Sequence, residues 1–226
     1  MFTSIAPRYD LLNHVLSCNV DRLWWRHTAR TFQRTLSRAD GRILDLCCGT
    51  GDMTFALRDQ AGNSSARIFG ADFSHAMLER AARKSEGSSF PPQWIEADAL
   101  NLPFPSAHFD LVTSAFGFRN LADYDAGLRE IARVLRPGGQ CGILDFGEPK
   151  GLFGSIYRFY FKQVLPRIGT MISGVRGPYV YLPASVERFP SPEEMLDRMK
   201  SAGFAEATWT PYTFGIAGLY RGKISM

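Results

Sequence analysis

Short apolar segments alternate with amphipathic ones through the middle of the chain. The apolar runs RILDL, RIFGADF, QWIEAD, FDLVTSAFGF and QCGILDF are predicted to be five strands. Three of the gaps between them hold MTFALRDQ, SHAMLERAARK and DAGLREIARVL, in which apolar residues recur at helical spacing. This alternation predicts a doubly wound α/β sheet with mostly parallel strands.

The two ends of the chain depart from this alternation. Residues 1–40 show helical spacing of apolar residues in LLNHVLS and DRLWWRHTARTFQRTL. After residue 149 come an aromatic-rich stretch of helical character, a helix that begins at Ser191, and the segment ATWTPYTFGIAGLYRGKI. This last segment predicts an antiparallel pair of strands joined near Gly215, so we expect a seven-stranded sheet. We divide the chain into residues 1–40, 41–149 and 150–226.

Two boundaries in the middle of the chain carry local signals. Ser74 directly precedes SHAMLERAARK, which predicts that Ser74 caps that helix. The segment RPGG follows DAGLREIARVL and predicts the end of that helix, with the next strand beginning at Gln140.

Composition narrows the class of protein. Of the 226 residues, 45% are hydrophobic and 21% are charged, which excludes a disordered, collagen-like or coiled-coil chain. No apolar stretch reaches the roughly 18 to 20 residues of a transmembrane helix. The segment MFTSIAPRYD lacks a signal-peptide pattern, so we expect a cytoplasmic protein. The four cysteines have no metal-binding spacing, and we predict free thiols and no metal site.

Charge is distributed unevenly along the chain. Residues 1–44 carry seven basic and three acidic residues, residues 45–149 carry nine and fourteen, and residues 150–226 carry ten and five. An acidic middle therefore lies between two basic ends. The net charge of +4 and the pI near 9.0 are weak grounds for nucleic-acid binding.

The glycine-rich turn LDLCCGTGD has the form of a ligand-binding loop. It leads from a strand that ends in Asp45 through Gly49, Thr50 and Gly51 into a helix, and glycine there lets the backbone approach a ligand closely. A dinucleotide-binding loop would have a third glycine where this chain has Thr54. An anionic Asp45 would repel a pyrophosphate and suits a cationic ligand with an amino group, such as S-adenosylmethionine.

Carboxylates follow the next two predicted strands. Asp72, followed by Phe73, ends the second strand, where a carboxylate can accept hydrogen bonds from both hydroxyls of a ribose. Asp98 and Ala99 follow the third strand, where a carboxylate can accept a hydrogen bond from an adenine amino group. A helix cap at Asp72 and a solvated loop at Asp98 are the structural alternatives.

Polar residues also follow the fourth strand, in TSAFGFRNLAD. Ligands of open α/β sheets bind beyond the carboxyl ends of the strands, so Ser114 is placed to contact the methionine part of the cofactor. Arg119 and Asn120 come after an aromatic-glycine turn and are candidates for the chemistry. The alternative is an exposed loop with a helix N-cap at Asp123.

Several of these motifs occur together in known enzymes. LDLCCGTGD, ADFS, EADALNLPF, FGFRN and RVLRPGG resemble a class I S-adenosylmethionine-dependent methyltransferase. More narrowly, FTSIAPRYDLLNHVLS, FGFRN, YLPASVERFP and YTFGIAGLYRG are similar to the ubiquinone/menaquinone biosynthesis C-methyltransferases, over nearly the whole chain. The resemblance implies contacts to S-adenosylmethionine at Thr50, Asp72, Asp98, Ala99 and Ser114. One departure is Cys47, because the general class often has glycine there.

The resemblance also implies a reaction. Its substrate would be a polyprenylated quinol that is methylated on a ring carbon. The segments LCCGTGD and ADFS favour demethylmenaquinol over the benzoquinol of ubiquinone synthesis. Phenols have a pKa of about 10, so a base or a phenolate-stabilising group is expected. We expect Arg119 to stabilise phenolate or to orient a water, with Asn120 and Asp98 holding that water.

The segments around the core are expected to complete the substrate site. Residues 1–40 would cover the substrate, as the corresponding segment of the family does. His14 is a competing base, or else a structural histidine of an apolar helix. The expected substrate-binding residues are Tyr9, His14, Phe116, Arg119 and Tyr181.

Five arginines recur every four residues near the N-terminus. On one helix they would form a slanted ridge beside Trp24 and Trp25, either as a solvated face or as a contact with the membrane surface. A bilayer-borne prenylated substrate favours a protein at the inner face of the cytoplasmic membrane, and residues 153–165 are a second candidate for the contact. The ridge comprises Arg22, Arg26, Arg30, Arg34 and Arg38.

Other classes of protein fit less well. A nicotinamide-dependent oxidoreductase shares the fold and Asp72 but would have the third glycine and no Asp45. A DNA amino-methyltransferase would need [DN]PP[YF] where this chain has SAFGF, and no cysteine follows proline as in a cytosine-ring enzyme. We therefore expect no nucleic-acid partner. Two alternatives remain: the protein could be a non-catalytic cofactor-binding module, and it could form a homodimer.

Overall fold

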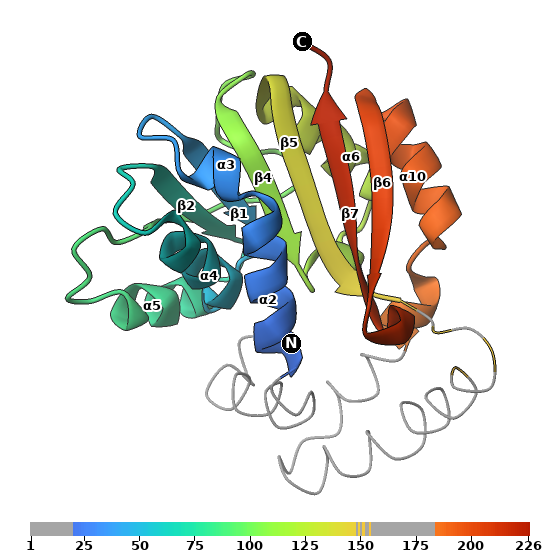
Figure 1. The fold of residues 1–226 in the computed structure, drawn as a ribbon, viewed down its shortest axis with the longest axis horizontal. Helices are drawn as coiled ribbons and strands as arrows, with labels where there is room; N and C mark the ends of the chain where they lie inside the picture. Colours follow the sequence, from blue (N-terminus) through green and yellow to red (C-terminus); the bar gives the residue numbers. More distant parts are fainter. Residues whose placement is uncertain (1–19, 148, 150, 152–153, 155–183) are drawn as a thin grey trace, which may run out of the picture.

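The computed structural model of the protein describes residues 20–147, 149, 151, 154 and 184–226 (Figure 1). Its strands are β1 (Arg42–Leu46), β2 (Arg67–Asp72), β3 (Gln93–Glu96), β4 (Phe109–Ala115), β5 (Leu135–Phe146), β6 (Phe204–Tyr212) and β7 (Ala217–Ile224). Its helices are α2 (Val20–Thr31), α3 (Gln33–Leu36), α4 (Asp52–Ala61), α5 (His75–Lys84), α6 (Tyr124–Val134) and α10 (Pro192–Ser201), with short 3-10 turns at η1 (Phe118–Asn120) and η3 (Thr213–Gly215).

The seven strands form one sheet in the order β3-β2-β1-β4-β5-β7-β6. Strands β1 to β5 pair in parallel, and β7 pairs antiparallel with both β5 and β6. This confirms the predicted doubly wound sheet and its antiparallel C-terminal pair. Because β1 to β5 are parallel, their carboxyl ends share one edge of the sheet, the lower edge in Figure 1. We call it the carboxyl edge.

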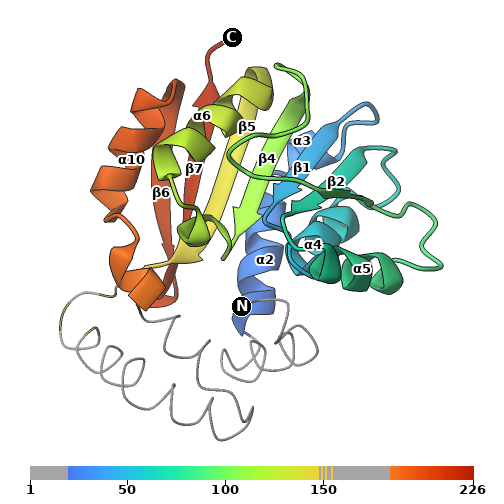
Figure 2. The ribbon, with the colours of Figure 1, turned by 180° about the vertical axis from the view of Figure 1, so that it is seen from behind.

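Helices cover both faces of the sheet. On one face, α2, α3 and α4 bury a cluster that includes Phe32, Leu57 and Leu144. On the other face, α6 and α10 bury a second cluster that includes Ile131, Met199 and Phe204 (Figure 2). Since β6 and β7 belong to the same sheet as β1 to β5, the C-terminal strands extend the core rather than forming a separate one.

Two of the predicted helices are defined by their capping residues. The Asp123 side chain accepts a hydrogen bond from Ala126 N at the start of α6. Ser191 and Glu194 form a reciprocal capping box at the start of α10. The boundary expected at Ser191 is therefore confirmed, and the N-cap at Asp123, which belonged to the structural alternative for its loop, is also present.

Two other boundaries differ from the prediction. Ser74 occupies the N-cap position of α5, but its hydroxyl makes no cap hydrogen bond. Strand β5 begins at Leu135, five residues before the predicted Gln140, because Leu135 already pairs with Phe109 of β4. The RPGG segment is an irregularity between this pair and the next one, Leu111 with Gln140. Gly138 adopts a positive φ of 74° and its N–H donates to Ser225 O, so this segment stays attached to the sheet instead of forming a free turn.

The predicted arginine ridge is interrupted. Helix α2 ends at Thr31 because Phe32 leaves helical geometry and packs its ring into the space above Gly142, which has no side chain. Arg34 therefore lies on the short helix α3, and Arg38 pairs with Asp40 and Asp110 beyond it. The ridge that remains comprises Arg22, Arg26 and Arg30.

Trp24 also differs from the prediction of an interfacial residue. Its ring is buried in the cluster beneath α2, and its Nε1 donates a hydrogen bond to Thr213 Oγ1 at 2.8 Å. A tryptophan held in this way is part of the core and does not reach a membrane interface.

Within the ranges that the structure describes, no helix is long and apolar enough to cross a membrane. The predictions for residues 1–19 and 155–183 lie outside the described residues. Of the aromatic stretch 153–165, the structure describes only Gly154.

Candidate active site

The loop after β1 turns across the ends of β1 and β2 at the carboxyl edge. Cys48 N donates to Ala71 O on β2, and Gly51 N donates to Cys48 O. Gly51 has a φ of 89°, and a Cβ there would lie 2.6 Å from the Trp94 ring, so only glycine fits. Cys47 adopts a φ of 55°, which costs a non-glycine residue about 1–2 kcal/mol. This is the position where the sequence departs from glycine.

Asp45 lies beneath this loop and is fully buried. Its two oxygens accept hydrogen bonds from Thr54 Oγ1 at 2.6 Å and Thr113 Oγ1 at 2.8 Å. Burial raises the pKa of Asp45 to about 7. In the structure the carboxylate joins β1 to α4 and β4, and a direct contact between Asp45 and the cofactor stays a prediction. Thr54 is one of the two hydrogen-bond partners of Asp45, and it is also the residue that distinguishes this loop from a dinucleotide-binding loop.

Asp72 ties the same loop to the end of β2. Its Oδ2 accepts from Gly49 N and its Oδ1 from Ser74 N, both at 2.8 Å. Burial raises the pKa of Asp72, and these backbone hydrogen bonds partly offset that rise. Each carboxylate oxygen has a further lone pair, so hydroxyl groups of a ribose can still donate to it. Phe73 is 79% exposed and offers a flat apolar face beside the carboxylate.

Asp98 and Ala99 begin the loop that follows β3. Asp98 is exposed and its Oδ1 accepts from Leu100 N, while Ala99 is buried beneath the loop. The sheet places β2 and β1 between β3 and β4, so the ends of β3 and β4 are three strand spacings apart, about 14 Å. Among the described residues, no hydrogen bond joins Asp98 to Arg119. That Arg119, Asn120 and Asp98 together position a water molecule stays a prediction.

The end of β4 meets the glycine-rich loop. Ser114 is buried beside the weakly polar Cys47 thiol, and within the described ranges its hydroxyl has no hydrogen-bond partner of good geometry. A buried hydroxyl without a partner is costly, and a polar atom of a ligand would satisfy it. Gly117 contacts the loop so closely that a Cβ there would lie 2.4 Å from Cys47 Cβ. Strand β4 and the glycine-rich loop therefore bound one site.

Arg119 is 7% exposed and lies in a buried ion pair. Its Nη1 donates to Asp145 Oδ1 at 3.0 Å and to Phe116 O, its main-chain N donates to Asp145 Oδ2, and its Nε donates to Ser185 Oγ at 3.4 Å. The sequence predictions missed Asp145 and Ser185. The sequence does mark both residues: Asp145 follows the apolar residues of β5, and Ser185 belongs to the motif YLPASVERFP.

An aromatic wall accompanies this ion pair at the carboxyl edge. The Phe116 and Phe146 ring centroids are 4.6 Å apart, and the Arg119 guanidinium lies 5.1 Å from the Phe146 centroid. Such contact stabilises a desolvated cation. The structure brings together Arg119 and Phe116 from the predicted substrate set, and Asn120 follows in the same turn, while Tyr9, His14 and Tyr181 lie outside the described residues.

The neighbouring thiols are not activated for nucleophilic chemistry. Burial, reinforced by nearby carboxylates, raises the pKa of both Cys47 and Cys48 above the usual thiol value. Burial also raises the pKa of Cys141. All three are free thiols, and a protonated thiol is a poor nucleophile.

Fold and site together define a class of enzyme. The sheet has an antiparallel seventh strand inserted before the sixth, a glycine-rich loop after β1, a carboxylate at the end of β2 and an unsatisfied hydroxyl at the end of β4. These are the features of a class I methyltransferase that uses S-adenosylmethionine as its cosubstrate. The chain belongs to the ubiE/COQ5 methyltransferase family, whose model matches residues 1–223.

Curated relatives resemble the chain over nearly its whole length. It is 49% identical to a demethylmenaquinone methyltransferase of Thermus thermophilus, covering 98% of this chain and 99% of the relative. It is 48% identical to a demethylmenaquinone methyltransferase of Deinococcus radiodurans, covering 98% and 90%. It is 44% identical to a ubiquinone/menaquinone biosynthesis C-methyltransferase of Geobacter sulfurreducens, covering 99% and 86%.

Solved structures support the fold alone. A SAM-dependent methyltransferase from Aquifex aeolicus matches with a TM-score of 0.63 at 16% identity, over 87% of this chain and 89% of that one. The [4+2]-cyclase SpnF matches with a TM-score of 0.66 at 20% identity, over 89% and 82%. Because a cyclase shares this fold, fold alone does not determine the reaction.

Proposed function

We propose that the protein methylates a ring carbon of demethylmenaquinol to give menaquinol, with S-adenosylmethionine as the methyl donor. The observation that carries this proposal is the 48–49% identity, over 98% of the chain, to two demethylmenaquinone methyltransferases. Methylation of the benzoquinol precursor of ubiquinone is the second candidate. It is supported by the 44% identity to a relative named for both quinones.

The cofactor would be held by residues at the carboxyl edge. When bound, S-adenosylmethionine would supply an electrophilic methyl group for the ring carbon, with the thioether as the leaving group. The ring carbon would then give up its proton to solvent. Asp72 would accept hydrogen bonds from the ribose hydroxyls, and Phe73 would pack against the adenosine. Ser114 would donate its otherwise unsatisfied hydroxyl to the methionine part. Asp98 would accept from the adenine amino group.

Arg119 would act on the quinol through a hydrogen bond rather than through net charge. Its guanidinium is already paired with Asp145, so the pair is close to neutral. Among the described residues, Nε and Nη1 have acceptors and Nη2 has none. We infer that Nη2 donates to the phenolate oxygen, or to a water that takes the phenolic proton, with Asn120 beside it in the same turn.

The substrate also determines where the enzyme must work. A polyprenylated quinol resides in the bilayer, so we infer that the protein acts at the inner face of the cytoplasmic membrane as a peripheral protein. Tyr9 and His14, from the N-terminal segment 1–40, would cover the quinol, as would the segment that contains Tyr181.

Radiolabelled cofactor tests the proposed function. The purified protein is incubated with methyl-labelled S-adenosylmethionine and either reduced demethylmenaquinone or the reduced benzoquinol analogue. We expect label in the naphthoquinol and none when the quinone is left oxidised, because its ring carbon is then not nucleophilic. Label in the benzoquinol alone would reverse the substrate assignment. Cofactor binding without transfer to either ring would indicate a non-catalytic binding module.

A further inference from the structure

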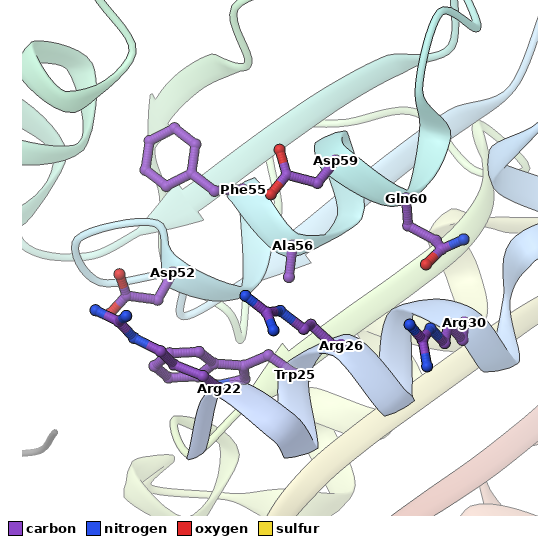
Figure 3. Close-up of a pocket in the computed structure, with 9 residues that line it drawn as sticks. All are labelled: Arg22, Trp25, Arg26, Arg30, Asp52, Phe55, Ala56, Asp59 and Gln60. Carbon is purple, nitrogen blue, oxygen red and sulfur yellow. The ribbon is translucent and has the colours of Figure 1, made fainter. Parts of the chain in front are cut away.

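The remaining arginine ridge faces a groove between α2 and α4 (Figure 3). The groove has a volume of about 420 Å³. Arg22, Arg26 and Arg30 line it from α2 together with Trp25, and the side chains of Arg22 and Arg26 extend towards α4. This arrangement is separate from the cofactor loop, although α4 begins directly after that loop.

The three guanidinium groups lack carboxylate partners among the described residues. All three side chains are exposed, and within the described part of the chain none lies within 4.0 Å of a carboxylate oxygen. Like charges four residues apart on a helix repel each other, so the row Arg22, Arg26, Arg30 is unfavourable by itself. An anion that bridges neighbouring guanidinium groups would remove that repulsion.

Acidic residues of the groove do not cancel this charge. Asp52 and Asp59 line the opposite side, and Asp52 lies 3.3 Å from Lys84 Nζ. The groove with Lys84 therefore carries four basic and two acidic side chains. Guanidinium groups bind two phosphate oxygens at once, so an exposed row of arginines favours a phosphate over a single carboxylate.

We propose that this groove binds the phosphate of an anionic phospholipid headgroup, with Arg22, Arg26 and Arg30 as its ligands. Apolar surface beside the row favours a lipid over a free phosphate: Leu23 is 61% exposed on α2, and Trp25 lines the groove. Helix α2 begins at the carboxyl edge (Figure 1), so the same contact would bring the active site to the bilayer. The choice of lipid rests on the proposed function.

Vesicle sedimentation tests the groove directly. The full-length protein is mixed with phosphatidylcholine vesicles that contain or lack phosphatidylglycerol. Wild-type protein is expected to prefer the anionic vesicles, and R22Q/R26Q/R30Q to lose that preference. Each arginine near an anionic surface contributes about five-fold in partition, so the triple variant should bind on the order of 100-fold more weakly. The single variant R26Q should lose about five-fold.

The matched control is R67Q. Arg67 begins β2 at the opposite edge of the sheet, is exposed, and within the described residues makes no ion pair. We expect R67Q to bind vesicles like wild type. An equal loss in R67Q, or wild-type binding by the triple variant, would overturn the proposal. So would full displacement from vesicles by inorganic phosphate at low millimolar concentration, which would identify a free-phosphate site instead.

Two further readouts separate the groove from the active site. The triple variant should unfold at no lower temperature than wild type, because it loses a repulsive row. It should also methylate a short-chain quinol that needs no membrane at the wild-type rate. If no quinol is methylated by either protein while vesicle binding depends on the three arginines, the proposed function fails and the lipid site stands.

Discussion

Replacing Asp145 with asparagine should destabilise the protein, because Asp145 is the buried partner of Arg119. Its carboxylate is fully buried and accepts from Arg119 Nη1 at 3.0 Å, Arg119 N at 3.1 Å and Phe146 N at 2.9 Å. Asp145→Asn leaves the buried guanidinium without its counter-charge. Removing one partner of a buried ion pair costs about 3–5 kcal/mol, out of a total stability of about 5–15 kcal/mol.

A double-mutant cycle measures the coupling. Arg119→Met should also destabilise by about 3–5 kcal/mol, because it leaves Asp145 charged and unpaired. The double variant should lose about 2–3 kcal/mol less than the sum of the two single losses. Urea unfolding followed by tryptophan fluorescence supplies the free energies. Asp125→Asn is the control, since its pair with Arg198 is shorter, at 2.7 Å, but only half-buried, and should cost no more than about 1 kcal/mol.

Turnover separates a structural role of Arg119 from a chemical one. Arg119→Ala should greatly lower kcat with cofactor affinity nearly intact, because the guanidinium serves the quinol and not the nucleoside. Asp145→Asn should lower kcat as well, since Arg119 loses the group that orients it. Additive losses of stability in the cycle would refute the buried pair. Normal turnover by folded Arg119→Ala would refute its role in the reaction.

Three further predictions concern the loop and its supports. Asp72→Asn should weaken S-adenosylmethionine binding about 10- to 100-fold by calorimetry, because a charged acceptor of ribose hydroxyls is lost; unchanged affinity would contradict that contact. Burial raises the pKa of Asp45 from 3.8 to about 7, so folding favours the protonated form. This difference in pKa adds about 4 kcal/mol to the free energy of unfolding below pH 3.8, and the contribution is lost as the pH rises through 7. Asp45→Asn should flatten this dependence in unfolding experiments at stepped pH, and an unaltered slope would exclude Asp45 as its source. Gly117→Ala should lower the melting temperature, because its Cβ would clash with Cys47. Adding Cys47→Gly should restore the melting temperature, because it removes both the clashing Cβ and the strained φ. If the double variant melts no higher than Gly117→Ala, the clash lies elsewhere.

Local patterns were sufficient for most of the fold. The buried strands RILDL and FDLVTSA carry continuous apolar runs, and α6 and α10 begin at residues whose side chains cap them, Asp123 and Ser191. Each of these signals acts between residues close in the chain, so it can be read without knowing the fold. The Ser74 hydroxyl does not cap α5, because the N–H of Met77 that it could accept from donates to the Ser74 main-chain carbonyl instead.

Side-chain partners across the sheet could not be predicted in this way. Thr113 is 68 residues from Asp45 in the chain and donates to its carboxylate only because β1 and β4 are neighbours. The Arg119–Asp145 pair likewise depends on the adjacency of β4 and β5.

By itself, the sequence determined the alternating strands and helices, the glycine-rich loop and the family, because these depend on local spacing and on motifs. Only the tertiary structure decided which charges are buried, which are paired and which face a groove. Phe32 packs over Gly142 and ends α2, so five regularly spaced arginines become a row of three. Burial and pairing depend on contacts between distant segments, and those contacts exist only once the sheet has formed.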